Sequence, residues 1–189
     1  MDEKDRSRLP ARAGMIAAVY AALTVLCLTL LQGLAWGPVQ FRISEAVCIL
    51  ALLTPAAVPG LTIGCLLANL LGMALTGSGV FGLLDVVFGT LATLLGALWM
   101  RRFKSRVGVA LLGPVLANAL IVPAYLPVIL AAYGFETIPF TAISLSSSYL
   151  LLYAFGFAAI ALGEAVVIYG LGLPLFKALQ NTEFFKKEA

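Results

Sequence analysis

The 189-residue sequence contains no histidine, and only 11% of its residues are charged. Without histidine the chain cannot form a Ser–His–Asp triad, and it lacks the commonest general base and a common zinc ligand. A G-x-x-x-x-G-K-[ST] stretch is also absent, which excludes ATP hydrolysis by the P-loop route. The three cysteines, Cys27, Cys48 and Cys65, lie in apolar runs at spacings that match no metal motif. We therefore expect no metal and no cofactor, and a protein that binds or transports something rather than an enzyme, although carboxylates alone can support acid–base chemistry.

Hydrophobic residues make up 62% of the chain, and its mean hydropathy is +1.05. A soluble domain averages about 45–50% apolar residues, so this composition predicts that lipid is the main solvent. Because a helix needs about 20 residues to cross the hydrocarbon core, the apolar runs predict an all-α membrane protein with six spans and a single substrate-binding domain over residues 1–189. The expected helices are 13–34, 44–54, 57–75, 81–100, 107–132 and 146–176.

Basic residues support an even number of spans. Six spans place the N-terminal segment, the loop after residue 100 and the C-terminal segment on one side of the membrane, and eleven of the twelve Lys and Arg residues then share that side. The positive-inside tendency makes this side cytoplasmic, with both termini there. Arg42 is the exception, and it lies three residues before Glu45. Between Arg12 and Asp85 these two are the only charged residues, which suggests that the pair has a task.

Polar residues inside the expected spans fall at two depths. Asn69, Asn118 and Glu164 lie about 17–18 Å from the cytoplasmic edge when counted at 1.5 Å per residue, close enough in depth to surround a polar ligand. A second layer is expected nearer the outer face. It comprises the polar and charged residues Gln40, Arg42, Glu45 and Asp85, with Tyr149 and Tyr153 beside them and with Trp36 and Phe41 available to stack on a flat ring.

Each of these residues also has a simpler interpretation. Asn69 and Asn118 could tie helices together by hydrogen bonds. Asp85 could be a helix N-cap, and Trp36 and Phe41 could be interfacial anchors. Arg42 and Glu45 could form a structural ion pair on one helix face. Glu164 is harder to explain in this way, because a carboxylate near the middle of a membrane is costly unless it is paired, protonated or solvated.

The first expected helix carries two adjacent rows of small residues, which make a flat strip near its cytoplasmic end. Ala13, Ala17 and Ala21 form one row, and Ala18 and Ala22, with Gly14, form the other. Such a strip lets another helix approach closely. The partner could be a helix of the same chain or a second protein.

Several stretches are similar to those of a known family. They are YAALT at 20–24, GPVQFRISEA at 37–46, PGLTIGCLLANLLG at 59–72, LDVVFGTLATLLGAL at 84–98, NALIV at 118–122 and GEAVVIYGLGLPL at 163–175. In them the chain resembles the QueT family of substrate-binding S-components of energy-coupling-factor (ECF) transporters. The stretches at 37–46 and 84–95 are the most specific, and together the six span most of the chain.

The resemblance implies a six-helix protein in the bacterial plasma membrane that captures a queuosine precursor outside the cell. The ligand would be a 7-deazaguanine base, with the 7-aminomethyl form favoured. It also implies partnership with a membrane-embedded T-component and two ATPases, which would account for the missing P-loop. The alanine strip, Ala13, Ala17, Ala18, Ala21 and Ala22, would dock on the T-component, so that bulk at Ala17 and Ala21 would stop uptake and leave ligand binding intact.

The resemblance assigns the ligand to the polar layers described above, with Glu164 or Glu45 at the guanine-like edge and the other carboxylate or Asp85 at the ammonium group. Arg42 would orient Glu45. Three alternatives stay open: an S-component for another small polar vitamin or nucleobase, a membrane-embedded enzyme that uses Asp85 or Glu164, and a structural membrane protein without a ligand.

Overall fold

The structure is a computed structural model that describes residues 3–30 and 42–182, and within these ranges it is helical and forms no strand. Five helical stretches are long and apolar enough to cross a membrane: Ser7–Leu30, Ala57–Thr76, Gly79–Arg102, Val107–Ala124 and Tyr149–Leu179. The share of each apolar window that is buried runs from 33% in the first to 50% in the fourth. Since much of each apolar span faces outward, the expectation of an all-helical, multi-pass membrane protein is confirmed.

The helices are interrupted at defined places. The first is α1 (Glu3–Leu30), and α4 (Ala57–Thr76) is continuous. Between them, η1 (Ile43–Ile49, a 3₁₀ helix) continues into α3 (Leu50–Leu53). The remaining elements are η2 (Gly79–Phe81), α5 (Gly82–Leu84), η3 (Asp85–Gly89, a π-helical turn), α6 (Thr90–Arg102), α7 (Val107–Ile121), η4 (Val122–Ala124), α8 (Leu126–Ala132), α9 (Tyr149–Val167), η5 (Ile168–Gly172, a π-helical turn) and α10 (Leu173–Leu179).

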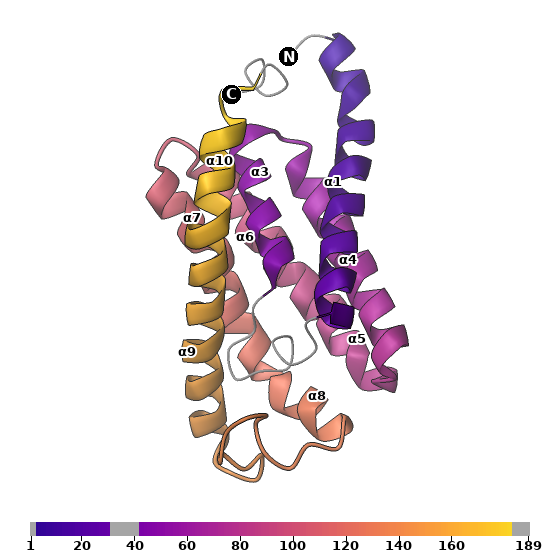
Figure 1. Ribbon diagram of the computed structural model, residues 1–189, viewed down its shortest axis with the longest axis vertical. Coiled ribbons are helices and arrows are strands. Elements are labelled where there is room, and N and C mark those ends of the chain that lie inside the picture. The colour runs from indigo at the N-terminus through magenta and orange to yellow at the C-terminus, as the bar shows by residue number, and fades with distance from the viewer. Residues whose placement is uncertain (1–2, 31–41, 183–189) are drawn as a thin grey trace.

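The long helices lie along the long axis of the molecule (Figure 1), and their pairwise contacts arrange them in a ring around that axis. Helix α1 packs on α4, α4 on α6, α6 on α7, and α7 on α9, while η1 contacts both α1 and η5 and closes the ring. In Figure 1, η1 begins about half-way along the bundle and runs with α3 toward the end where α1 starts. The short segment Ile43–Leu53 therefore takes part in the ring over only one half of the length of the bundle.

The start of α1, the α6–α7 turn and the end of α10 lie at the same end of the bundle (Figure 1). This basic end carries Arg8, Arg12, Arg101, Arg102, Lys104, Arg106 and Lys177. Three basic clusters that are far apart in the sequence thus meet in space. The arrangement accords with the expected charge asymmetry, whereas the count of six spans and the side on which the termini lie stay predictions.

Close contact between α1 and α4 uses one of the two rows of small residues. A Cβ atom added to Gly60 would lie 2.8 Å from the carbonyl oxygen of Ala13, and one added to Gly64 would lie 2.9 Å from that of Ala17. Ala13, Ala17 and Ala21 are accordingly buried, whereas Ala18 and Ala22 are exposed. The expectation that all five alanines form one docking strip needs correction, because three of them already pack inside the chain.

Candidate functional site

A cavity lies inside the ring, in the half away from the basic end. Its volume is about 110 Å³, several times the roughly 10–15 Å³ that holds one water molecule. The polar residues that line it come from α1, the start of η1, α4, the Ser78–Asp85 region, α7–α8 and α9, and they are Thr24, Arg42, Asn69, Thr76, Ser78, Asp85, Asn118, Tyr125, Tyr133 and Glu164. Apolar residues such as Met73, Val122 and Ile160 complete the lining. A pocket of this kind fits a small, partly polar ligand.

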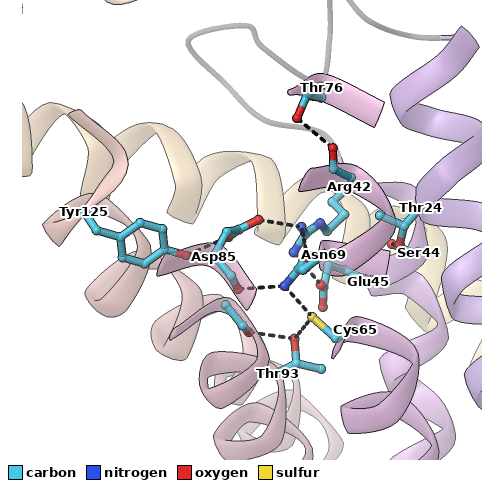
Figure 2. Close-up of polar contacts among 12 residues, drawn as sticks. Thr24, Arg42, Ser44, Glu45, Cys65, Asn69, Thr76, Asp85, Thr93 and Tyr125 are labelled. Carbon is cyan, nitrogen blue, oxygen red and sulfur yellow. Dashed lines mark hydrogen bonds and ion pairs between the residues drawn. The ribbon is translucent and has the colours of Figure 1, made fainter. Parts of the chain in front are cut away.

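Arg42 lies immediately before η1, and its guanidinium joins residues from three parts of the chain (Figure 2). Its Nη2 atom donates a hydrogen bond of 3.0 Å to Oδ1 of Asn69 and lies 3.7 Å from Oδ2 of Asp85. Its Nη1 atom lies 3.9 Å from Oε1 of Glu45. One cation is therefore shared by two carboxylates and an amide, and its side chain keeps 26% of its surface exposed.

Asp85 begins the π-helical turn η3, and hydrogen bonds hold both its side chain and its backbone carbonyl. Oδ1 accepts a hydrogen bond of 2.8 Å from the Tyr125 hydroxyl, and the Asp85 carbonyl oxygen accepts one of 2.8 Å from Nδ2 of Asn69. A Cβ atom at Gly89 would lie 2.7 Å from Oδ1 of Asp85, so a glycine is needed where the carboxylate folds back over the turn. Asp85 remains 34% exposed, and this leaves its carboxylate available to a ligand in the cavity.

Glu45 has a different environment from Asp85. Its side chain is 0% exposed and is absent from the cavity lining. The Tyr20 hydroxyl of α1 donates to Oε1, and the Cys48 thiol lies 3.1 Å from Oε2 as a donor. Both carboxylate oxygens thus have donors within the protein. The structure places Glu45 behind Arg42 as its buried counter-ion, away from the space that a ligand would occupy.

Asn118 on α7 and Glu164 on α9 are both buried, at 2% and 7% exposure, and both line the cavity. Among the described residues, Nδ2 of Asn118 and Oε2 of Glu164 have no hydrogen-bond partner. Buried polar atoms are nearly always hydrogen-bonded, and those that are not need an explanation. A donor and an acceptor that face one cavity indicate that a ligand supplies the missing partners.

The structure brings together five of the residues that the sequence suggested. Asn69, Asn118 and Glu164 share the cavity, as expected from their depth, and Arg42 and Asp85 join them there. Two separate layers are not observed, because Arg42 bonds directly to Asn69. Tyr149 is 59% exposed and donates to the carbonyl oxygen of Ala124 outside the cavity. Trp36, Gln40 and Phe41 lie outside the described residues.

The sequence-based predictions did not include three tyrosines of this site, Tyr20, Tyr125 and Tyr133. Tyr125 lies between Pro123 and Pro127, where the expected fifth helix breaks into α7, η4 and α8, and the break turns its hydroxyl toward Asp85. Tyr20 is completely buried and holds Glu45. The flanking prolines were a usable signal for Tyr125. Tyr20 gave none, because a tyrosine in an apolar helix is equally typical of an interfacial anchor.

Comparison with known proteins identifies the family. Residues 11–181 match the model of the QueT transporter family. The chain belongs to the QueT transporter family. A curated relative, the queuosine precursor transporter QueT of Lactococcus lactis subsp. cremoris (strain MG1363), is 35% identical over 94 residues. This match covers 48% of the present chain and 50% of the relative, so the chain spans about half the length of that relative.

No solved structure matches the chain. Membership of the QueT family makes this a transporter-family protein and removes the membrane-embedded enzyme from the alternatives. In this setting, the cavity with its unpartnered polar atoms is the candidate ligand site, since a transporter must hold its cargo within the membrane-spanning part.

Proposed function

We propose that this protein is the substrate-binding S-component of an ECF-type importer for a queuosine precursor, and that its ligand is a 7-deazaguanine base. The observation that carries the proposal is a pair of buried atoms in one cavity, Nδ2 of Asn118 and Oε2 of Glu164, that have no hydrogen-bond partner within the described part of the chain. The printed name of the Lactococcus relative supports the choice of ligand class.

A guanine-like edge would provide hydrogen-bond partners for both Asn118 and Glu164. It presents a ring N–H and an amino group side by side, and one carboxylate can accept from both. Glu164 would take this role. The ring carbonyl beside the N–H is an acceptor, which the amide of Asn118 can satisfy as a donor. Tyr125 and Tyr133 also line the cavity and offer aromatic faces to a flat base; stacking of this kind contributes about 1–3 kcal/mol per base.

The charges of the site favour the 7-aminomethyl form, which is a cation. Glu45 and Asp85 both lie within ion-pair distance of the Arg42 guanidinium, at 3.9 and 3.7 Å, and Glu164 lines the same cavity, so carboxylates outnumber guanidinium groups among these residues. Asp85 is the partly exposed carboxylate of the lining, and it would receive the ammonium group. Glu45, which the sequence offered as a ligand contact, is too deeply enclosed for this role.

Transport would need partners. We propose that a T-component and two ATPases supply the energy in the bacterial plasma membrane, as in other ECF importers. With the basic end in the cytoplasm, the cavity lies in the outer half of the bundle, where it can capture a ligand from outside.

Titration of the purified chain with 7-aminomethyl-7-deazaguanine, followed by calorimetry, tests this function. Glu164→Gln keeps the side-chain shape but puts an N–H where an acceptor is needed, so we expect the Kd to rise at least tenfold, equivalent to about 1.4 kcal/mol. Glu136→Gln removes the same charge from an exposed loop residue and should leave the Kd unchanged.

Three results would contradict the proposal. An unchanged Kd in the Glu164→Gln variant would remove Glu164 from the site. Binding of unrelated vitamins but of no deazaguanine by the unaltered protein would favour an S-component for another nutrient, and no binding of either class would favour a structural role.

A further inference from the structure

We infer that Glu45 determines which ligand charge the site accepts, although it does not contact the ligand. It acts through Arg42 as a specificity-determining, positioning residue. This inference rests on the proposed function and concerns the preference for a cationic over a neutral base.

Glu45 is enclosed within the protein. Its side chain has no exposed surface, and Tyr20 and Cys48 donate to its two carboxylate oxygens. Among the described hydrogen bonds and ion pairs of Glu45, the one that reaches a residue of the cavity lining is the pair with Arg42, whose Nη1 atom lies 3.9 Å from Oε1. Glu45 therefore acts on a ligand in the cavity without contacting it, through its electrostatic field and through the position that it gives to Arg42.

The Arg42 guanidinium is shared between two carboxylates. Its Nη2 atom lies 3.7 Å from Oδ2 of Asp85, which is a similar distance to that of the Glu45 pair. Asn69 holds the same Nη2 atom at 3.0 Å and also donates to the Asp85 carbonyl oxygen, which fixes the guanidinium between the two acids (Figure 2). If both carboxylates are ionised, the cluster of Arg42, Glu45 and Asp85 carries one net negative charge; this count leaves aside Glu164, which also lines the cavity.

The excess negative charge is accessible from the cavity at Asp85. Glu45 is sealed, whereas Asp85 is 34% exposed and lines the cavity. Because Glu45 already neutralises part of Arg42, Asp85 remains available to attract a cation from the cavity. If Glu45 were uncharged, Arg42 would have Asp85 as its carboxylate partner at this place, and the local charge would fall to zero. A cationic ligand would then lose its attraction, while a neutral ligand of the same ring would lose little.

The experiment compares two ligands that differ in charge, 7-aminomethyl-7-deazaguanine and 7-methyl-7-deazaguanine, and measures both Kd values by calorimetry. In Glu45→Gln we expect the preference for the amine over the methyl compound to fall at least tenfold. In the double variant Arg42→Gln/Glu45→Gln both charges are removed together, so the net charge is restored and the preference should return to within threefold of the unaltered protein. Glu136→Gln, an exposed charge removal, should not change the preference.

Each other outcome overturns the inference. Equal weakening of both ligands in Glu45→Gln would show a purely structural role, and an unchanged preference would show no role in charge selection. If the double variant prefers the amine over the methyl compound as weakly as Glu45→Gln does, Glu45 contacts the amine directly. The double variant removes the buried Glu45 together with its cation and leaves Asp85, which is 34% exposed and accepts a hydrogen bond from Tyr125, as the remaining charge. It therefore remains informative if the single variant fails to fold; a lost preference there is sufficient to reject the inference.

Failure of the proposed function gives a different result. In that case the unaltered protein binds neither deazaguanine, and no preference exists to be changed.

Discussion

At the scale of single residues, the charge pair in GPVQFRISEA divides its work. Arg42 and Glu45 are three residues apart, and the first turn of η1, closed by a hydrogen bond of 2.9 Å from the Glu45 N–H to the Arg42 carbonyl, sends their side chains to different environments. Arg42 reaches the cavity, and Glu45 lies in the core beside Tyr20. The pair is therefore both the structural ion pair and the element of the site that the sequence suggested as alternatives.

Asn118 and Asn69 provide a matched comparison at this scale, because both are buried amides in the cavity lining. We expect Asn118→Leu to leave the thermal stability of the ligand-free protein unchanged or higher, since its Nδ2 atom has no partner among the described residues, and to raise the Kd for 7-aminomethyl-7-deazaguanine about three- to tenfold. Asn69→Leu should lower stability, because Asn69 bonds to Arg42 and to the Asp85 backbone.

Thermal unfolding of the ligand-free variants, together with titration, checks these expectations. A loss of stability in Asn118→Leu similar to that in Asn69→Leu would assign Asn118 to helix tying instead of ligand binding.

At the scale of elements, α1 has two faces with different tasks. One row of small residues packs on Gly60 and Gly64 of α4, and the other, with Gly14, Ala18 and Ala22, is exposed. If α1 docks on a T-component, the exposed row is the available surface. The expectation that bulk at Ala17 leaves binding intact is not compatible with its contact on Gly64.

A pair of leucine substitutions separates the two faces. We expect Gly64→Leu to destabilise the protein by about 1–3 kcal/mol, because even its Cβ atom would lie 2.9 Å from the Ala17 carbonyl oxygen and 3.0 Å from the Tyr20 Cβ atom. Ala18→Leu should keep stability and ligand binding and should reduce uptake in cells that carry the ECF partners. Thermal unfolding, titration and uptake of labelled ligand are the three measurements. Normal uptake by Ala18→Leu would exclude this face from docking.

At the scale of the whole molecule, the start of α1, the α6–α7 turn and the end of α10 form one end of the bundle (Figure 1). The cavity is lined by residues from the other half, such as Thr24, Met73 and Ile129. The positive-inside tendency predicts a cytoplasmic basic end, and under that prediction the cavity would lie in the outer half. The short segment Ile43–Leu53 is essential to this arrangement, since it returns the chain toward the basic end although it fills only half of the ring.

Cysteine labelling in intact cells tests the orientation. We expect a membrane-impermeant maleimide to label Ala142→Cys, in the loop after α8, but to label Ser7→Cys and Ser105→Cys only after permeabilisation. All three positions are exposed, and the native Cys27, Cys48 and Cys65 are buried, which keeps background labelling low. Labelling of Ser7→Cys and Ser105→Cys from opposite sides would refute the six-span count, and labelling of Ser7→Cys in intact cells would refute the predicted side of the N-terminus.

The sequence by itself determined the membrane class, the positions of the long apolar helices and the gathering of basic residues at one end. These are properties of composition and run length, and they do not depend on how helices rotate against one another. Depth counting also brought Asn69, Asn118 and Glu164 to one level, because rise per residue is nearly constant in a helix.

Only the tertiary structure decided which polar groups meet. The 3₁₀ helix η1, the π-helical turn η3 and the proline break after α7 each rotate the side chains that follow them, so a linear count cannot say which ones face the cavity. For this reason Arg42 reaches Asn69, Tyr125 reaches Asp85, and Glu45 turns inward to Tyr20. Distance along the chain fixes the depth of a residue, whereas its partners depend on the rotation and contact of whole helices.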